Sequence, residues 1–171
     1  MATKLELMGF DTYLEQIRAL RDDALPICKA TVYPGAAILA QKMREETEAL
    51  PTITNRQARQ NYRDGTINTA LSEGQKAGLL EGLGITPISR QQGGIIQCSV
   101  GFAGYNGVKT KHFPGGQPNA EVARSLEKGT SYLKRNAFVA RAVRKARSEA
   151  IEAMRAEADA QIERIMNEHS E

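Results

Sequence analysis

The sequence predicts a single α+β domain with an N-terminal helix pair, a small antiparallel sheet and a long C-terminal helix. Apolar residues recur at helical spacing near both ends of the chain, and residues 85–104 alternate as the strands of a hairpin do. The 171 residues, 41% hydrophobic and 25% charged, are typical of one globular domain. We expect a core over about residues 9–147 and a helical extension over about 148–171.

Two helices are expected before residue 51. Phe10, Leu14 and Ile17 follow one another at spacings of four and three, which is the pattern of an amphipathic helix. A second helix is expected from about residue 22 to Leu50. Pro34 lies inside it, and its ring removes one backbone hydrogen bond, so a local kink is expected there.

A polar segment over residues 51–70 carries three arginines at helical spacing, Arg56, Arg59 and Arg63. A short helix would place the three guanidinium groups on one face. Such a face can bind a phosphate backbone or an acidic partner. The alternative is a solvated basic face or loop, because Tyr62 is the only aromatic residue that accompanies it.

The middle of the chain predicts a leucine-rich helix, a hairpin and a loop. Ser72 and Gln75 have the spacing of a capping box, and Gly84 is the expected stop of that helix. The hairpin has its turn at Gly93-Gly94. Residues 105–119 are loop by composition. Their Gly-rich start lacks the spacing of a phosphate-binding loop, which argues against nucleotide binding.

The last helix is expected from about residue 137 to 166, and its charges are segregated. Cations come first and carboxylates follow. Cations at a helix N-terminus oppose the helix dipole, so another group should favour positive charge there. Nucleic acid, an acidic partner or the acidic end of a neighbouring copy in a ring would do so, and a plainly solvated helix is the alternative. The cations in question are Lys134, Arg135, Arg141, Arg144, Lys145 and Arg147.

Several functional classes are not indicated by the sequence. Its carboxylates lie on predicted helix faces, its serines have no His-bearing neighbourhood, and no cluster of metal ligands is evident, so we expect no enzyme, no cofactor and no metal site. Cys28 and Cys98 are far apart and indicate no disulfide framework. No apolar run approaches the ~18 residues of a membrane span, and no secretory signal is evident, so a cytoplasmic protein is expected.

The stretch from Asn119 to Arg144 carries a family resemblance; it comprises a short amphipathic segment, a Gly-Thr break and the start of the last helix. Ala123-Arg124, Glu127, Gly129-Thr130, Phe138 and Arg141-Ala142 together resemble the Glu-x-Gly-Thr … Pro-Phe-x-x-Pro-Ala signature of the tail-component family of long-tailed bacteriophages. The order of the other segments is also similar over most of the chain. The chain departs from the signature at Asn136-Ala137, where a proline is expected before the phenylalanine, and at Ala140, which occupies the following basic or proline position.

This resemblance implies a structural virion protein, a tail-completion, tail-terminator or head–tail joining component that assembles as a ring at the neck. The implied partners are other copies of the chain, expected as a hexamer, the connector and tail-tube proteins, and DNA in the lumen, with no membrane. The implied location is the virion, with host cytoplasm during assembly. The family has no activity from which catalytic residues could be carried over.

Positive charge is concentrated locally, which keeps a second hypothesis open. Residues 1–50 carry a net charge of −2, residues 51–130 of +4 and residues 131–171 of +1. The alternative to a virion ring is therefore a small basic nucleic-acid-binding module. In either case the basic residues expected to face DNA or a partner are Arg56, Arg59, Arg63, Lys134, Arg135, Arg141, Arg144 and Lys145.

Overall fold

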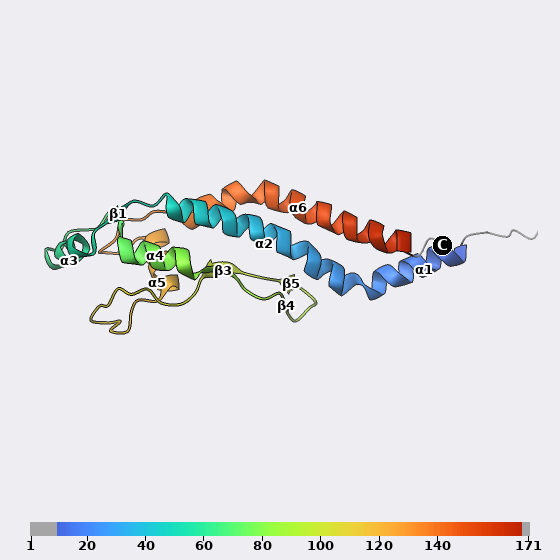
Figure 1. Ribbon diagram of the computed structural model, residues 1–171, viewed down its shortest axis with the longest axis horizontal. Helices are drawn as coiled ribbons and strands as arrows, with labels where there is room; N and C mark the ends of the chain where they lie inside the picture. The colour runs from blue at the N-terminus through green and yellow to red at the C-terminus, as the bar shows by residue number, and fades with distance from the viewer. Residues whose placement is uncertain (1–9, 169–171) are drawn as a thin grey trace, which may run out of the picture.

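The computed structural model describes residues 10–168 and shows an elongated molecule (Figure 1). Helix α1 (Phe10–Asp22) leads into α2 (Ala24–Glu48), and α6 (Phe138–Glu168) returns alongside α2 in the opposite direction. The remaining elements lie below α2 and beyond its C-terminal end. The α+β class, the N-terminal helix pair and the long C-terminal helix are thus confirmed.

Contacts along the antiparallel pair of α2 and α6 set its register. Near the end of α2, Glu46 binds two residues of the first turns of α6. Near its middle, Gly35 lies directly against Met154, and a β-carbon there would stand 2.5 Å from the methionine sulfur. At the other end, the Gln16 side chain of α1 donates to the backbone carbonyl of Met166 at 3.0 Å. Helix α2 continues through Pro34 without interruption.

A helical extension was expected over residues 148–171. Its described part, which ends at residue 168, lies along α2 and α1. Ile165, near the end of α6, has an exposed fraction of only 1%. The contacts of Met154 and Met166 place the rest of this segment beside α2 and α1. Residues 169–171 and the first nine residues lie outside the described range.

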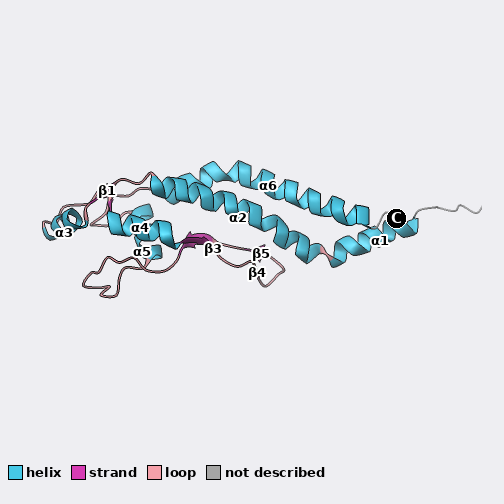
Figure 2. Ribbon diagram, in the orientation of Figure 1, coloured by secondary structure: helices cyan, strands magenta, loops and turns pink. Residues whose placement is uncertain are grey.

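The strands form three short pairs. Figure 2 shows how little of the chain they occupy beside the helices. β3 (Leu83–Ile85) pairs antiparallel with β6 (Val100–Phe102), and β4 (Ser89–Arg90) with β5 (Ile96–Gln97). These pairs form one ribbon whose turn holds Gly93 and Gly94 at positive φ, which confirms the expected hairpin. Between the two pairs the register shifts by one residue, because the strand that holds Pro87 has one extra residue there. This bulge accommodates Pro87, which has no backbone N–H to donate.

The parallel pair of β1 (Thr52–Ile53) and β2 (Leu71–Ser72) was not expected from the sequence. Two residues are too few for a periodic pattern, so the pairing could not be inferred from alternation. Between these strands lies α3 (Asn55–Arg63), which confirms the expected short helix. Thr54 caps α3 by accepting a hydrogen bond from the backbone N–H of Gln57.

Helix α4 (Glu73–Gly82) begins with the predicted capping box between Ser72 and Gln75. Its predicted stop at Gly84 is wrong by two residues. The chain enters β3 at Leu83, because the carbonyl of Gly82 accepts the N–H of Ala103 and starts the ladder with β6. Helix α5 (Asn119–Lys128) follows the long loop and packs beside α4.

The hydrophobic core lies where the end of α2, α4, α5 and the start of α6 meet. Phe138 is fully buried at the start of α6, and its ring lies 5.8 Å from that of Phe102 in β6. The side chains that make up this cluster are Leu50, Leu71, Leu79, Val122, Ala123, Leu126 and Phe138. Since every one of these except Phe138 is aliphatic, the core buries a modest area per residue.

The loop between β6 and α5 is anchored at its base. Asn119 donates from its side chain to the carbonyl of Ala103 at 2.8 Å, and Asn106 donates to the side-chain oxygen of Asn119 at 3.4 Å. Both asparagines are buried. An antiparallel bridge between Tyr105 and Pro118 closes the loop above them. The expected loop over 105–119 is therefore confirmed up to Pro118, and α5 starts at Asn119.

Over residues 10–168, no helix combines the length and the apolar character that a membrane span requires.

Candidate functional site

Glu127, at the end of α5, caps the start of α6. Its carboxylate accepts hydrogen bonds from the backbone N–H groups of Val139 at 3.0 Å and Ala140 at 3.3 Å. The first N–H groups of a helix have no partner within the helix, and the helix dipole favours a negative charge beside them. Glu127 supplies both the acceptor and the charge, from the preceding helix.

Gly129 and Thr130 make the turn between α5 and α6. Gly129 stands at φ +77°, where a side chain would be strained and would press on Arg135, 3.1 Å from its β-carbon. The Thr130 hydroxyl oxygen accepts the backbone N–H groups of Tyr132 and Leu133. The turn is therefore fixed by local hydrogen bonds that a threonine side chain can make.

Three further residues of the resemblance lie on the first turns of α6. Phe138 and Ala142 are fully buried, and Phe138 belongs to the core cluster. Arg141 donates from Nε to the Glu46 carboxylate and from a terminal nitrogen to the Asn136 side chain, both at 2.8 Å. The six residues Glu127, Gly129, Thr130, Phe138, Arg141 and Ala142 thus build one junction.

Glu46 accounts for two of the cations at the start of α6. Its carboxylate is 7% exposed and binds Arg141 at 2.8 Å and Lys145 at 2.6 Å. Hydrogen bonds from Lys145 and Arg141 hold the pKa of Glu46 below its ordinary value, despite its burial. The charges of Arg141 and Lys145 are therefore directed at α2 of the same chain. Arg144 between them is exposed and makes no ion pair within residues 10–168.

Two basic segments that are far apart in the sequence lie together at the α3 end of the molecule. The N–H of Asn68 donates to the carbonyl of Tyr132, and the N–H of Lys134 donates to the carbonyl of Asn68, each at 2.8 Å. The Asn61 side chain donates to that of Asn68, also at 2.8 Å. These bonds tie the segment after α3 to the segment between α5 and α6.

Aromatic side chains reinforce this contact. The rings of Tyr62 on α3 and Tyr132 lie 5.3 Å apart at an angle of 50°. Both remain more than half exposed, at 59% and 56%. An exposed tyrosine pair keeps two hydroxyl groups accessible to a partner.

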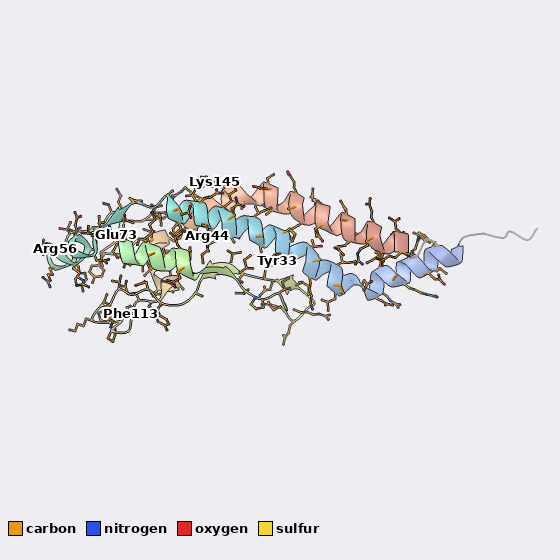
Figure 3. The ribbon with its side chains drawn as sticks, viewed as in Figure 1. Tyr33, Arg44, Arg56, Glu73, Phe113 and Lys145 are labelled. Atoms are coloured by element: carbon orange, nitrogen blue, oxygen red, sulfur yellow. The ribbon has the colours of Figure 1, made fainter. Side chains whose placement is uncertain are left out.

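A shallow hollow beside the tyrosines adds further cations. Its lining contains no carboxylate and consists of Ile67, Thr69, Lys128, Gly129, Thr130, Leu133, Lys134 and Arg135. We define the basic tip as the exposed cations of α3 and the cations of this hollow together with the two tyrosines. Its members are Arg56, Arg59, Arg63, Tyr62, Lys128, Tyr132, Lys134 and Arg135. Figure 3 shows Arg56 at the extreme end of the molecule, far from Tyr33.

The structure thus divides the basic residues predicted from the sequence into two groups. Five belong to the basic tip, whereas Arg141 and Lys145 pair with Glu46 and Arg144 lies on the exposed side of α6. Lys128 was not predicted as a member. It lies on a different helix from Arg56, and only the tertiary contact between residues 68 and 133 brings the two segments together.

Charge is polarised over the whole molecule. Residues 51–147, which include α3, α4 and α5, hold 15 Lys and Arg against 5 Asp and Glu, a net charge of +10. The other described residues, 10–50 and 148–168, hold 7 against 13, a net charge of −6. Because α1 and the end of α6 lie opposite α3 (Figure 1), the two ends of the molecule have opposite signs.

Other parts of the described chain offer less distinctive chemistry. No group of three or more His, Cys, Asp or Glu side chains within residues 10–168 lies close enough to hold a metal ion. A second hollow, between α2 and the ribbon, is mainly apolar and is lined by Tyr33, Ile85, Thr86, Pro87 and Ile88. The basic tip remains the surface with the most distinctive chemistry.

No family model matches the chain, and searches of curated proteins and of solved structures found no match.

Proposed function

We propose that this protein is a structural virion component of a long-tailed bacteriophage, a tail-completion, tail-terminator or head–tail joining protein that assembles as a ring at the neck. In this proposal it acts in the virion and is made and assembled in the host cytoplasm. Its partners are other copies of itself, expected as a hexamer, and the connector and tail-tube proteins.

The observation that carries this proposal is the junction between α5 and α6. Six of the eight residues that carry the resemblance to the tail-component family have a defined task there: a cap, a positive-φ turn, a hydroxyl acceptor, a core anchor, an ion pair or a buried helix position. Of the other two, Ala123 is buried in the core and Arg124 is exposed. Because these residues lie within one short stretch of the sequence, their proximity in the fold is expected. Their separate tasks in one turn between two helices support the resemblance as a shared structural device.

The large surface of the chain supports self-association. The accessible surface is 11,799 Å², whereas a compact monomer of 18.7 kDa exposes about 8,300 Å². The twelve residues outside the described range can contribute at most about 1,900 Å² of this, the area of a fully unfolded segment. The remaining excess is on the order of 1,500 Å², similar to the area that one chain buries in two standard interfaces of about 800 Å² per partner, as a ring subunit with two neighbours would do.

The mass of the purified protein tests this proposal. We expect light scattering to give a multiple of the 18.7 kDa chain mass, either alone or after addition of tail tubes, and electron micrographs to show rings at tube ends. Tubes without the protein are the control. A mass of one chain under both conditions, with unoccupied tube ends, would contradict it.

One observation favours a second candidate, the small nucleic-acid-binding module. The basic tip combines exposed cations with exposed tyrosines, which is a common composition of nucleic-acid surfaces. This candidate requires a monomer that binds duplex DNA with strong salt dependence. The same mass measurement, repeated with DNA, separates the two, because a ring is expected only for the virion protein.

A further inference from the structure

We propose that the basic tip binds the phosphate backbone of duplex DNA without reading its sequence. This inference rests on the proposed function only for the source of the DNA, which in a neck ring would be the DNA that passes through the lumen. The binding itself is a property of the chain, so it can be tested on the purified protein.

The cations of the tip are not neutralised within the described chain. None of the six, Arg56, Arg59, Arg63, Lys128, Lys134 and Arg135, makes an ion pair among residues 10–168. Like charges held side by side repel one another, so this arrangement destabilises the folded chain unless a negative partner is present. By contrast, Arg141 and Lys145 of α6 have their counter-charge in Glu46.

The composition of α3 matches the groups that contact phosphate. Apart from Ala58, its nine residues are Arg, Gln, Asn and Tyr, with no carboxylate. Phosphate oxygens in protein–DNA complexes are bound by these side chains, and such contacts carry no sequence information. Two of the amides are engaged within the chain, Gln60 with Asp64 and Asn61 with Asn68, so the three arginines are the main candidates for phosphate contacts.

The dimensions of the tip also suit a duplex. Arg56 and Arg63 are separated by seven residues of helix, about 10 Å at 1.5 Å per residue. Duplex DNA presents about six charges over this length. The hollow with Lys128, Lys134 and Arg135 extends the surface beside α3, so several phosphates can be contacted at once.

Equilibrium binding of a labelled duplex of about two helical turns tests the proposal, with two triple variants. One is Arg56→Gln, Arg59→Gln, Arg63→Gln, and the other is Lys128→Gln, Lys134→Gln, Arg135→Gln. If all six cations contact phosphate, log K is expected to fall with log salt with a slope of about −5, and each triple variant should reduce that slope by about 3. Two unrelated duplex sequences should bind equally well.

The matched control is the variant Arg18→Gln, Lys29→Gln, Arg155→Gln. It removes the same charge from exposed positions on α1, α2 and α6, outside the tip. We expect its salt slope to equal that of the parent chain. Circular dichroism of all three variants verifies that they are folded. Because each variant replaces exposed cations with uncharged glutamine, its spectrum should equal that of the parent chain.

The possible outcomes are distinct. Absence of salt-dependent binding by the parent chain, or an equal loss in the control variant, would overturn the proposal. If the tip variants lose self-association while DNA binding is unchanged, the tip binds the acidic end of another copy and the proposal is wrong. A chain that binds DNA through the tip but remains one copy with tail tubes would support this inference and contradict the proposed ring.

Discussion

Glu46 shows how much one buried carboxylate determines at the junction of α2 and α6. It accepts hydrogen bonds from two cations located 95 and 99 residues further along the chain. Lone buried charges are costly, and this one is stable only because both partners are present. Arg141 and Lys145, which from the sequence alone are candidates for a partner surface, have this internal role in the structure.

We expect Glu46→Gln to destabilise the protein by about 1–3 kcal/mol at neutral pH, because two charge-assisted hydrogen bonds are lost. Urea unfolding measures this difference. The matched control is Glu45→Gln, which also has an ion-pair partner, Lys42 at 3.5 Å, but is exposed, and it should change stability by less than about 0.5 kcal/mol. Equal effects of the two substitutions would show that burial of Glu46 is unimportant.

The pH dependence has a definite sign. The pKa of Glu46 is lowered in the folded chain from an ordinary value of 4.5, so the unfolded chain takes up the proton first as the pH falls. The contribution of Glu46 is therefore complete above the unfolded pKa and is lost as the pH falls through the lower folded pKa. Unfolding measured from pH 7 to pH 3 should show the difference between the parent chain and Glu46→Gln shrinking. A constant difference would exclude this titration.

The sequence analysis did not single out Glu46, although Met43 and Leu50 lie three residues before and four residues after it, at helical spacing, and are buried. Glu45, Glu46 and Glu48 are neighbours in one acidic stretch, and the packing of α2 against α6 decides which of them is buried. Phe138 is different. A large apolar residue at the start of an amphipathic helix predicts a core anchor, and the Phe138 side chain is completely buried in the structure.

At the level of elements, the layer of α4, α5 and the loop between β6 and α5 depends on close backbone approach. A β-carbon on Gly82 would collide with the carbonyl oxygen of Ala103, which also accepts a hydrogen bond from the buried Asn119 side chain. Gly78 is similarly close to Asn106. These glycines let α4 pack directly on the loop base, and hence hold the loop against the core.

Gly82→Ala is therefore expected to destabilise the protein by about 1–3 kcal/mol, as overpacking of a filled site does. Alanine normally improves stability in a helix, so helix propensity alone predicts the opposite sign. Gly84→Ala is the control, since a β-carbon added there would have no atom within 4 Å and the φ of Gly84 is not positive. The denaturant midpoints of the two variants measure their stability. A Gly82→Ala variant as stable as the parent chain would refute the close contact.

The elements that the sequence predicted well are those with a local signal. Helical periodicity located α1, α2 and α6, the capping box located α4, and the Gly-Gly turn located the ribbon. The pairing of β1 with β2 and the bridge between Asn68 and Leu133 have no local signal, because they join short segments across the sequence. The basic tip depends on that bridge. The sequence therefore predicted basic residues on both sides of the bridge, but it did not predict that the two sides lie together.

For the whole molecule, the proposed ring has a thermodynamic consequence. Assembly that buries the excess surface would stabilise the folded chain by mass action, so the midpoint of thermal unfolding should rise with protein concentration. Calorimetry over a hundredfold range of concentration, at fixed salt and pH, measures the rise. A midpoint that stays constant over this range would contradict assembly of the chain alone.

The opposite charges at the two ends also make the molecule an electric dipole. A nearby polyanion would exert a torque on it and turn the α3 end forward before contact, which raises the rate of productive encounters. Helix α6 alone is about 46 Å long at 1.5 Å per residue, whereas salt at 0.1 M screens charge beyond about 10 Å. In dilute salt a polyanion should orient the whole molecule from a distance. In physiological salt it should orient the molecule only when the two are within about 10 Å of each other.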